Sequence, residues 1–243
     1  MKPTVTAEGW KKPKKILVIL AHPDDPEFFC GGMIARWMDL GHKVSYCLLT
    51  KGQRGFHDKN MDPKTMAVIR TKEQFEAAAV LGVTEIKFLD HMDGELVADI
   101  ALRDELIKEI RYQKPDVVVS CDPTNLFPAV NRINHPDHRA AGQAVLDAVF
   151  PAVGNPAYQF AKDQEANESH QVKEIWLTLT KQPNFVIALT PYLDKKISAL
   201  MCHSSQVKNT ASELRERYLK FSITTDENGN TDYCEKFYRI ILS

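Results

Sequence analysis

Two short runs of histidine and aspartate contain the residue types that bind a divalent metal ion. The first run reads Ala21-His22-Pro23-Asp24-Asp25-Pro26-Glu27. His22 offers an imidazole nitrogen and Asp25 a carboxylate oxygen, and both are good zinc ligands. Asp24 lies between them and is free to carry a proton. Taken alone, a His-x-x-Asp pattern is more often a solvated acidic turn than a metal site.

The second run reads His135-Pro136-Asp137-His138 and stands at the start of a predicted helix. Its two histidines are three residues apart, so they lie on the same side of a helical turn. Asp137 favours the helix N-terminus by its negative charge. Taken alone, this run is more often a capping segment with surface histidines.

The two runs together supply more imidazoles and carboxylates than a turn or a cap requires. Two imidazoles, one carboxylate and a further base make a set typical of a catalytic metal site, in which one position stays open for water. Either His135 or His138 could reach the ion. The remaining histidine would then be free to assist the substrate.

The elements that position these runs alternate between strand and helix in the first half of the chain. Short aliphatic segments predict strands at residues 15–20, 44–50, 86–89 and 117–120. Helical spacing predicts helices at residues 33–40, 67–81, 100–112 and 137–150, the last one ended by Pro151. This order indicates an α/β fold with a mostly parallel sheet and helices on both faces. The carboxyl ends of such strands form the ligand crevice, and both runs can open onto it.

The second half of the chain has weaker patterns. We expect strands at residues 175–180 and 185–189, helices at 192–202 and 212–221, and a short terminal element after residue 230. Residues 153–171 are polar and irregular, which indicates a surface loop. Because there is no long linker, internal repeat or low-complexity tract, we expect one domain over residues 1–243.

Composition excludes several classes of function. The 243 residues are 44% hydrophobic and carry a formal net charge of -1. The overall charge therefore gives no attraction to nucleic acid or to an anionic membrane. The longest apolar runs are too short to cross a bilayer. The five cysteines include no Cys-x-x-Cys pair, which argues against a disulfide framework or a thiolate zinc site and favours the cytoplasm. No Gly-x-Gly-x-x-Gly follows the first strand, which argues against a dinucleotide enzyme.

Several motifs together resemble the PIG-L (LmbE-like) family of N-acetylglucosaminyl deacetylases. They are the two runs above, Cys30-Gly31-Gly32, Leu49-Thr50-Lys51-Gly52, Arg70 to Glu73, Met92-Asp93-Gly94, and His203-Ser204-Ser205-Gln206. The resemblance implies a Rossmann-like, LmbE-like three-layer sandwich. It implies Zn²⁺ on His22, Asp25 and His138, with Fe²⁺ as another possible metal. It also implies Asp24 as general base and His135 as a protonated helper that stabilises the oxyanion, and Asp137 could favour that cation.

The same resemblance suggests how a substrate is held. Arg70 and Asp93 match positions that contact polar substrate groups, and His203 could reach the site of its own or a neighbouring subunit in a homo-oligomer. The expected reaction is removal of an acetyl or other acyl group from the amide nitrogen of an N-acetylglucosamine-type small molecule. Two residues differ from those of many family members, namely Pro26 after the aspartate pair and Gln53 near the sugar site. These differences affect the expected substrate and not the expected metal.

Two alternative functions stay open at this point. The chain could be a zinc amidase acting on another N-acyl compound or on a thiol conjugate, which the sequence does not separate from a sugar deacetylase. It could also be a non-catalytic sugar-binding relative, although the presence of Asp24 and His135 argues against that.

Overall fold

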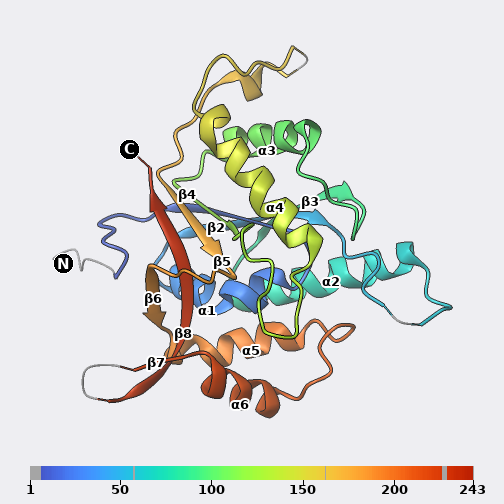
Figure 1. Cartoon of the computed structure of the whole chain (residues 1–243), viewed down its shortest axis with the longest axis vertical. Helices are drawn as coiled ribbons and strands as arrows, with labels where there is room; N and C mark the ends of the chain where they lie inside the picture. The colour runs from blue at the N-terminus through green and yellow to red at the C-terminus, as the bar shows by residue number, and fades with distance from the viewer. Residues whose placement is uncertain (1–6, 57, 162, 226–228, 243) are drawn as a thin grey trace.

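A computed structural model describes residues 7–56, 58–161, 163–225 and 229–242. Strands and helices alternate from the N-terminus as far as α4, and the order is irregular after it (Figure 1). The strands are β1 (Lys15–Leu20), β2 (Lys43–Thr50), β3 (Glu85–His91), β4 (Val117–Cys121), β5 (Glu174–Thr178), β6 (Phe185–Ala188), β7 (Ile223–Thr225) and β8 (Thr231–Ile241). The helices are α1 (Asp25–Asp39), α2 (Pro63–Leu81), α3 (Ile100–Gln113), α4 (Pro136–Asp147), α5 (Leu193–Met201) and α6 (Ala211–Phe221).

The strands form one sheet whose order is β3-β2-β1-β4-β5-β8-β6, with β7 paired to β8. The strands from β3 to β5 are parallel, whereas β8 runs antiparallel to β5, β6 and β7. The chain proceeds outward from β1 to β3 and then returns to place β4 on the other side of β1. The strand order therefore reverses between β1 and β4, and ligands bind at such a reversal in open α/β sheets.

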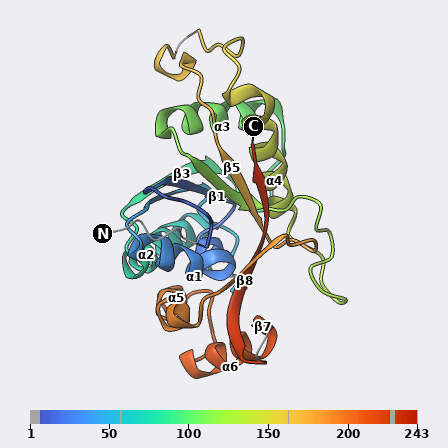
Figure 2. The ribbon, with the colours of Figure 1, turned by 90° about the vertical axis from the view of Figure 1, so that its left-hand side faces the viewer.

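Side chains of β1 alternate between two apolar cores, one on each face of the sheet. Ile16, Val18 and Leu20 pack in the core that includes residues of α1, α2 and α5. Leu17 and Ile19 pack in the core that includes residues of α3 and α4. Figure 2 shows the sheet between these helices. The predicted mostly parallel sheet with helices on both faces is thereby confirmed.

Helix α1 differs from the sequence expectation because it begins at Asp25 rather than at residue 33. Pro26 fits the first turn of a helix, where its missing N–H would have no partner. The helix is kinked at Cys30, whose φ is -146°. Beyond the kink, the Glu235 carboxylate of β8 accepts hydrogen bonds from the N–H groups of Gly32 and Met33 at 2.9 and 2.8 Å. A partner distant in sequence thus allows one helix to continue through the glycine pair.

The end of the chain also differs from expectation. The element after residue 230 is the eleven-residue strand β8, which pairs with β5, β6 and β7.

Helix α4 ends at Asp147 and continues as a π-helical segment, Ala148–Val153. The irregular segment that follows is anchored by the buried Arg111, whose guanidinium donates to main-chain carbonyls of Ala152, Val153, Asn155, Tyr158 and Ala166.

Two observations bear on the compartment and on cysteine chemistry. None of the described helices is long and apolar enough to cross a membrane. All five cysteines are free thiols, and four of them are buried. The expected cytoplasmic location stays a prediction.

Helix α4 carries His138 and packs closely on the end of β4 at Gly142. A Cβ atom added at Gly142 would lie 2.2 Å from the carbonyl oxygen of Cys121. We expect Gly142→Ala to lower the free energy of unfolding by about 1–2 kcal/mol, because an overpacked side chain costs about 1–3 kcal/mol and alanine regains at most about 1 kcal/mol of helix propensity. Urea denaturation measures the change.

The exposed neighbour Gln143 provides the matched control for this substitution. Gln143→Ala should alter stability by less than about 0.5 kcal/mol. An unchanged unfolding midpoint in Gly142→Ala would show that α4 and β4 can separate freely, contrary to the close packing.

Candidate metal centre

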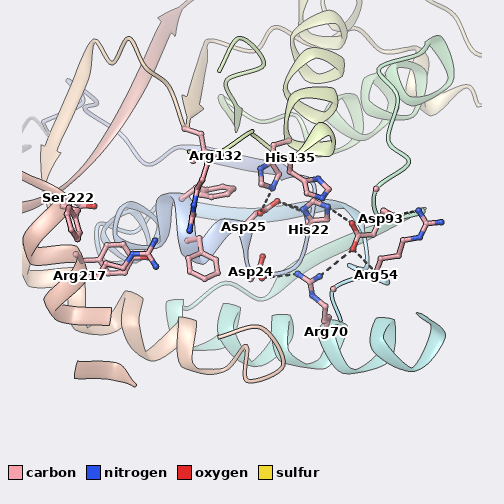
Figure 3. A pocket seen from close by; sticks show the side chains of 18 residues that line it. His22, Asp24, Asp25, Arg54, Arg70, Asp93, Arg132, His135, Arg217 and Ser222 are labelled. Carbon is pink, nitrogen blue, oxygen red and sulfur yellow. Dashed lines mark hydrogen bonds and ion pairs between the residues drawn. The ribbon is translucent and has the colours of Figure 1, made fainter. Parts of the chain in front are cut away.

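The two histidine and aspartate runs meet at the carboxyl ends of β1 and β4. His22 follows β1 directly, and Asp24 and Asp25 lead into α1. His135 and His138 lie at the start of α4, after the long loop that follows β4. These side chains line a cavity of about 860 Å³ (Figure 3). The strand reversal therefore brings together all five residues that the sequence singled out.

His22, Asp25 and His138 can each direct one donor atom at a single point, since their donor atoms lie within 4.8 Å of one another. The Asp25 Oδ1 atom is 3.1 Å from His138 Nε2, and the Asp25 Oδ2 atom is 3.4 Å from His22 Nδ1. Asp25 Oδ2 also accepts a hydrogen bond from the main-chain N–H of His22 at 2.8 Å. Two nitrogens and one carboxylate form the donor set of a catalytic zinc site.

The other ring nitrogens of the two histidines face polar partners. His22 Nε2 lies 3.1 Å from Asp137 Oδ2 and 3.2 Å from Asp93 Oδ1. His138 Nδ1 lies 3.1 Å from the side-chain oxygen of Asn134. Such partners fix the tautomer of a metal-binding histidine and increase its basicity. They leave His22 Nδ1 and His138 Nε2, the two nitrogens that face Asp25, available to a metal ion.

A second group, His22, His135 and Asp137, also satisfies the distance requirement for a metal site. Its carboxylate is already engaged, because Asp137 accepts main-chain hydrogen bonds from Gly94 at 2.7 Å and from Leu96 at 3.3 Å. Asp137 also contacts His22 Nε2, as described above. The geometry therefore suits Asp137 to orienting His22, and it favours the group that contains His138 as the metal-binding one.

The electrostatics of the site favour a cation. Burial lowers the pKa of His22, but hydrogen bonds to Asp137 and Asp25 outweigh it, and the net pKa lies well above the usual value. Burial raises the pKa of Asp25, but His138 and His22 outweigh it, and the net pKa lies well below the usual value. An imidazole that readily gains positive charge beside an ionised carboxylate fits a divalent ion, which would take the place of the proton.

Asp24 occupies a strained position between the ligands. Its φ is 86°, a left-handed conformation uncommon for a residue with a side chain. The Gln74 side chain of α2 accepts the Asp24 N–H at 2.8 Å, and Arg70 donates to Asp24 Oδ2 at 3.1 Å and to the Pro23 carbonyl at 2.7 Å. Burial raises the pKa of Asp24 to about 6, with Arg70 opposing the rise.

Behind Asp24 lies a fully buried polar group that does not reach the cavity. The Gln74 amide donates to both carboxylate oxygens of Glu27, at 3.0 and 3.1 Å. His203 Nε2 lies 3.2 Å from Glu27 Oε2. His203 is therefore placed beneath the turn rather than among the cavity-lining residues. Its expected contact with substrate stays a prediction.

His135 lines the cavity, and its expected role as a protonated helper stays a prediction. Its Nδ1 atom accepts the main-chain N–H of Asp137 at 3.2 Å, which makes it the N-cap of α4. Partial desolvation and the imidazole of His22 lower the pKa of His135, although Asp137 opposes them. With Nδ1 accepting, the neutral ring carries its proton on Nε2. A neutral His135 would therefore be able to donate a hydrogen bond through Nε2.

Arg70 and Asp93 both line the cavity, and their contact with a substrate stays a prediction. The Arg70 Nη1 and Asp93 Oδ2 atoms are 3.9 Å apart, and the main-chain N–H of Arg54 donates to Asp93 at 3.1 Å. Sequence reasoning missed other contributors from distant segments, namely Gln74, Asn134, Arg54, Arg132, Arg217 and the orienting role of Asp137. Local signals existed for Asp137, which stands in the second run itself, and for Gln74, which follows Arg70 by one turn of α2.

The chain matches the family described as PIG-L, GlcNAc-PI de-N-acetylase, over residues 17–149. Among curated proteins it is 32% identical over 213 residues to a diacetylchitobiose deacetylase of Thermococcus kodakarensis, covering 88% of this chain and 78% of that one. It is 26% identical to a probable N-acetyl-alpha-D-glucosaminyl L-malate deacetylase 2 of Bacillus anthracis, covering 86% of this chain and 88% of that one.

A similar solved structure is the N,N'-diacetylchitobiose deacetylase of Pyrococcus horikoshii. The TM-score is 0.79 at 30% sequence identity, and the match covers 95% of this chain and 85% of that one. The matched residues 17–149 make up more than half of the chain and include both metal-binding runs. On this evidence the chain belongs to the PIG-L family.

Proposed function

We propose that this protein is a metal-dependent deacetylase that removes an acetyl or related acyl group from the amide nitrogen of an N-acetylglucosamine-type small molecule. The observation that carries the proposal is the arrangement of one cavity. A two-histidine, one-carboxylate donor set lies there beside a buried carboxylate, Asp24, and a hydrogen-bond donor, His135. The relatives named above are deacetylases of N-acetylated sugars, which supports the same class of substrate here.

His22, Asp25 and His138 would hold the ion, and the nitrogen-rich donor set favours Zn²⁺, with Fe²⁺ as the alternative. When bound, such an ion polarises an amide carbonyl and lowers the pKa of water in its open position. The outer partners Asp137 and Asn134 keep the two imidazoles aligned. The chain's own contribution is therefore a rigid three-ligand face directed into the cavity.

Asp24 is the proposed general base. A carboxyl with a pKa of about 6 is ionised at neutral pH yet basic enough to accept a proton from the attacking water. The same group can then deliver that proton to the nitrogen of the departing amine. The contact with Arg70 orients the carboxylate, and the Gln74 hydrogen bond holds the main chain that bears it.

His135 is the proposed donor to the developing oxyanion. The residue lines the cavity while its Nδ1 is held by the start of α4, which leaves Nε2–H free to donate. A neutral imidazole can act in this way, because a hydrogen bond aimed at the site of new charge stabilises the transition state without being ionised itself. Arg70 and Asp93 are proposed to contact the polar groups of the sugar.

A panel of acylated substrates tests the proposed function against its alternatives. Metal-loaded protein should release acetate from N-acetylglucosaminides. Release only from other N-acyl compounds or thiol conjugates would support a different amidase. No release from any member of the panel would support a non-catalytic binding protein.

The first prediction for this site concerns the metal. His22→Ala, Asp25→Ala and His138→Ala should each sharply reduce the zinc content of protein purified after zinc loading, because each removes one of three ligands. Elemental analysis measures the stoichiometry. His135→Ala is the matched control and should keep its metal. Full occupancy in all three ligand variants would refute the assignment.

The second prediction concerns Asp24. Asp24→Asn keeps the size of the side chain but cannot accept the proton, so turnover should fall by roughly 10²–10⁴ while zinc stays bound. Steady-state kinetics and metal analysis on the same preparation check both parts. The exposed carboxylate Asp90 provides a control, since Asp90→Asn lies outside the metal cavity. Near-normal turnover in Asp24→Asn would show that another group accepts the proton.

The third prediction separates the two histidines of α4. His135→Ala should bind zinc normally, show a nearly unchanged KM and lose about 10²–10³ in kcat, the usual cost of one oxyanion donor. The opposite pattern, in which His135→Ala loses its metal and His138→Ala keeps it, would exchange the two roles.

A further inference from the structure

The metal cavity has two sides that differ in how their arginines are paired. On one side, Arg70 is 3.1 Å from Asp24 and Arg54 forms an ion pair with Glu95. Arg54 also donates to the main-chain oxygen of Asp93 at 3.1 Å. The positive charges on this side are therefore largely compensated by carboxylates of the chain itself.

On the other side of Asp25, Arg132 and Arg217 line the same cavity (Figure 3). Arg132 comes from the loop between β4 and α4, and Arg217 comes from α6. Within the described part of the chain, neither guanidinium forms an ion pair, a side-chain hydrogen bond or a contact over an aromatic ring. The fold thus brings two unpaired guanidinium groups to one cavity from segments far apart in the sequence.

The lining near these two arginines offers them no acidic partner. The cavity lining also includes Phe28, Phe29, Leu179, Tyr218, Phe221 and Ser222. Arg132 and Arg217 are exposed to solvent, and a substrate that fills the cavity would displace water from their guanidinium groups and so strengthen their interaction with an anion. A guanidinium in such surroundings is best satisfied by an anion that arrives with the ligand.

The charges of the residues that line the cavity also favour an anionic ligand. Its lining includes four arginines against three aspartates, namely Asp24, Asp25 and Asp93. A divalent ion held by Asp25 would add two more positive charges. Since Arg54 and Arg70 already pair with carboxylates, the uncompensated positive charge of the lining arginines lies at Arg132 and Arg217.

We propose that Arg132 and Arg217 form an anion subsite that binds a carboxylate or phosphate group of the substrate. The planar guanidinium matches the geometry of both groups and can bind them through two parallel hydrogen bonds. This inference rests on the proposed deacetylase function and narrows its substrate class to acylated amino sugars that carry a negative charge. The charge can come from the aglycone or from the acyl group.

Kinetics with three synthetic substrates test the subsite and identify the source of the charge. One is a neutral methyl N-acetylglucosaminide, the second is N-acetylglucosaminyl malate with an anionic aglycone, and the third is N-succinylglucosamine with an anionic acyl group. The wild-type protein should show a higher kcat/KM for one anionic substrate than for the neutral one. The anionic substrate that is preferred identifies the part of the molecule that reaches Arg132 and Arg217.

Variants assign that preference to the two arginines. Arg132→Ala and Arg217→Ala should each reduce the ratio of anionic to neutral kcat/KM by about tenfold, as expected for loss of one charge-assisted contact. Arg217→Glu should reduce the ratio further. Arg215→Ala is the matched control on α6, because Arg215 pairs with Asp194 outside the cavity, and it should leave the ratio unchanged. An unchanged ratio in both alanine variants overturns the subsite.

Binding measurements keep the inference testable if the protein releases no acyl group from any of these substrates. Titration calorimetry can compare glucosaminyl malate with methyl glucosaminide on the zinc-loaded protein. Tighter binding of the anionic compound that is lost in Arg132→Ala and Arg217→Ala supports the subsite even without turnover. Equal affinities for the two compounds in the wild-type protein refute it, whereas absent turnover alone refutes only the deacetylase function.

Discussion

The site depends on the hydrogen-bonded turn that follows β1. Asp25 accepts the main-chain N–H of His22, and Gln74 accepts that of Asp24, so the turn is closed from within and held from α2. With Asp24 in this left-handed conformation, the side chains of Asp24 and Asp25 point toward different partners. Asp25 faces the metal position and Asp24 faces Arg70. A local cost in backbone strain is thereby offset by buried hydrogen bonds, as is common at functional sites.

Polar side chains of distant elements support this turn at every point. Asp137 and Asn134 contact the imidazoles of His22 and His138, and Arg70 and Gln74 hold Asp24. Glu27 contacts both Gln74 and His203 at a deeper level. Buried polar groups stabilise one arrangement when they are paired, and in this network only Arg70 Nε and His203 Nδ1 are buried without a hydrogen-bond partner among the described residues. Rigidity matters here because catalysis depends on groups already aimed at the place where charge will develop.

The cavity contains three groups of side chains that differ in charge and in pairing. The candidate metal position lies at the centre, the paired arginines Arg54 and Arg70 lie toward Asp93, and Arg132 and Arg217 lie on the other side. The central group is the one that the two sequence runs predict. Arg54 and Arg132 come from loops and Arg217 comes from α6, and such peripheral segments often set the choice of substrate on a shared scaffold.

The sequence by itself determined the α/β class, the alternation of strands and helices, and the ligand types gathered in the two runs. These are local properties, since hydrophobic periodicity and donor chemistry act over a few residues. Tertiary structure alone decided that Asp137 contacts the ring of His22. It also decided that His203 lies beneath the turn and that Arg132 and Arg217 line the same cavity. Each of these depends on which strands cross over to become neighbours, and no short stretch of sequence records that contact.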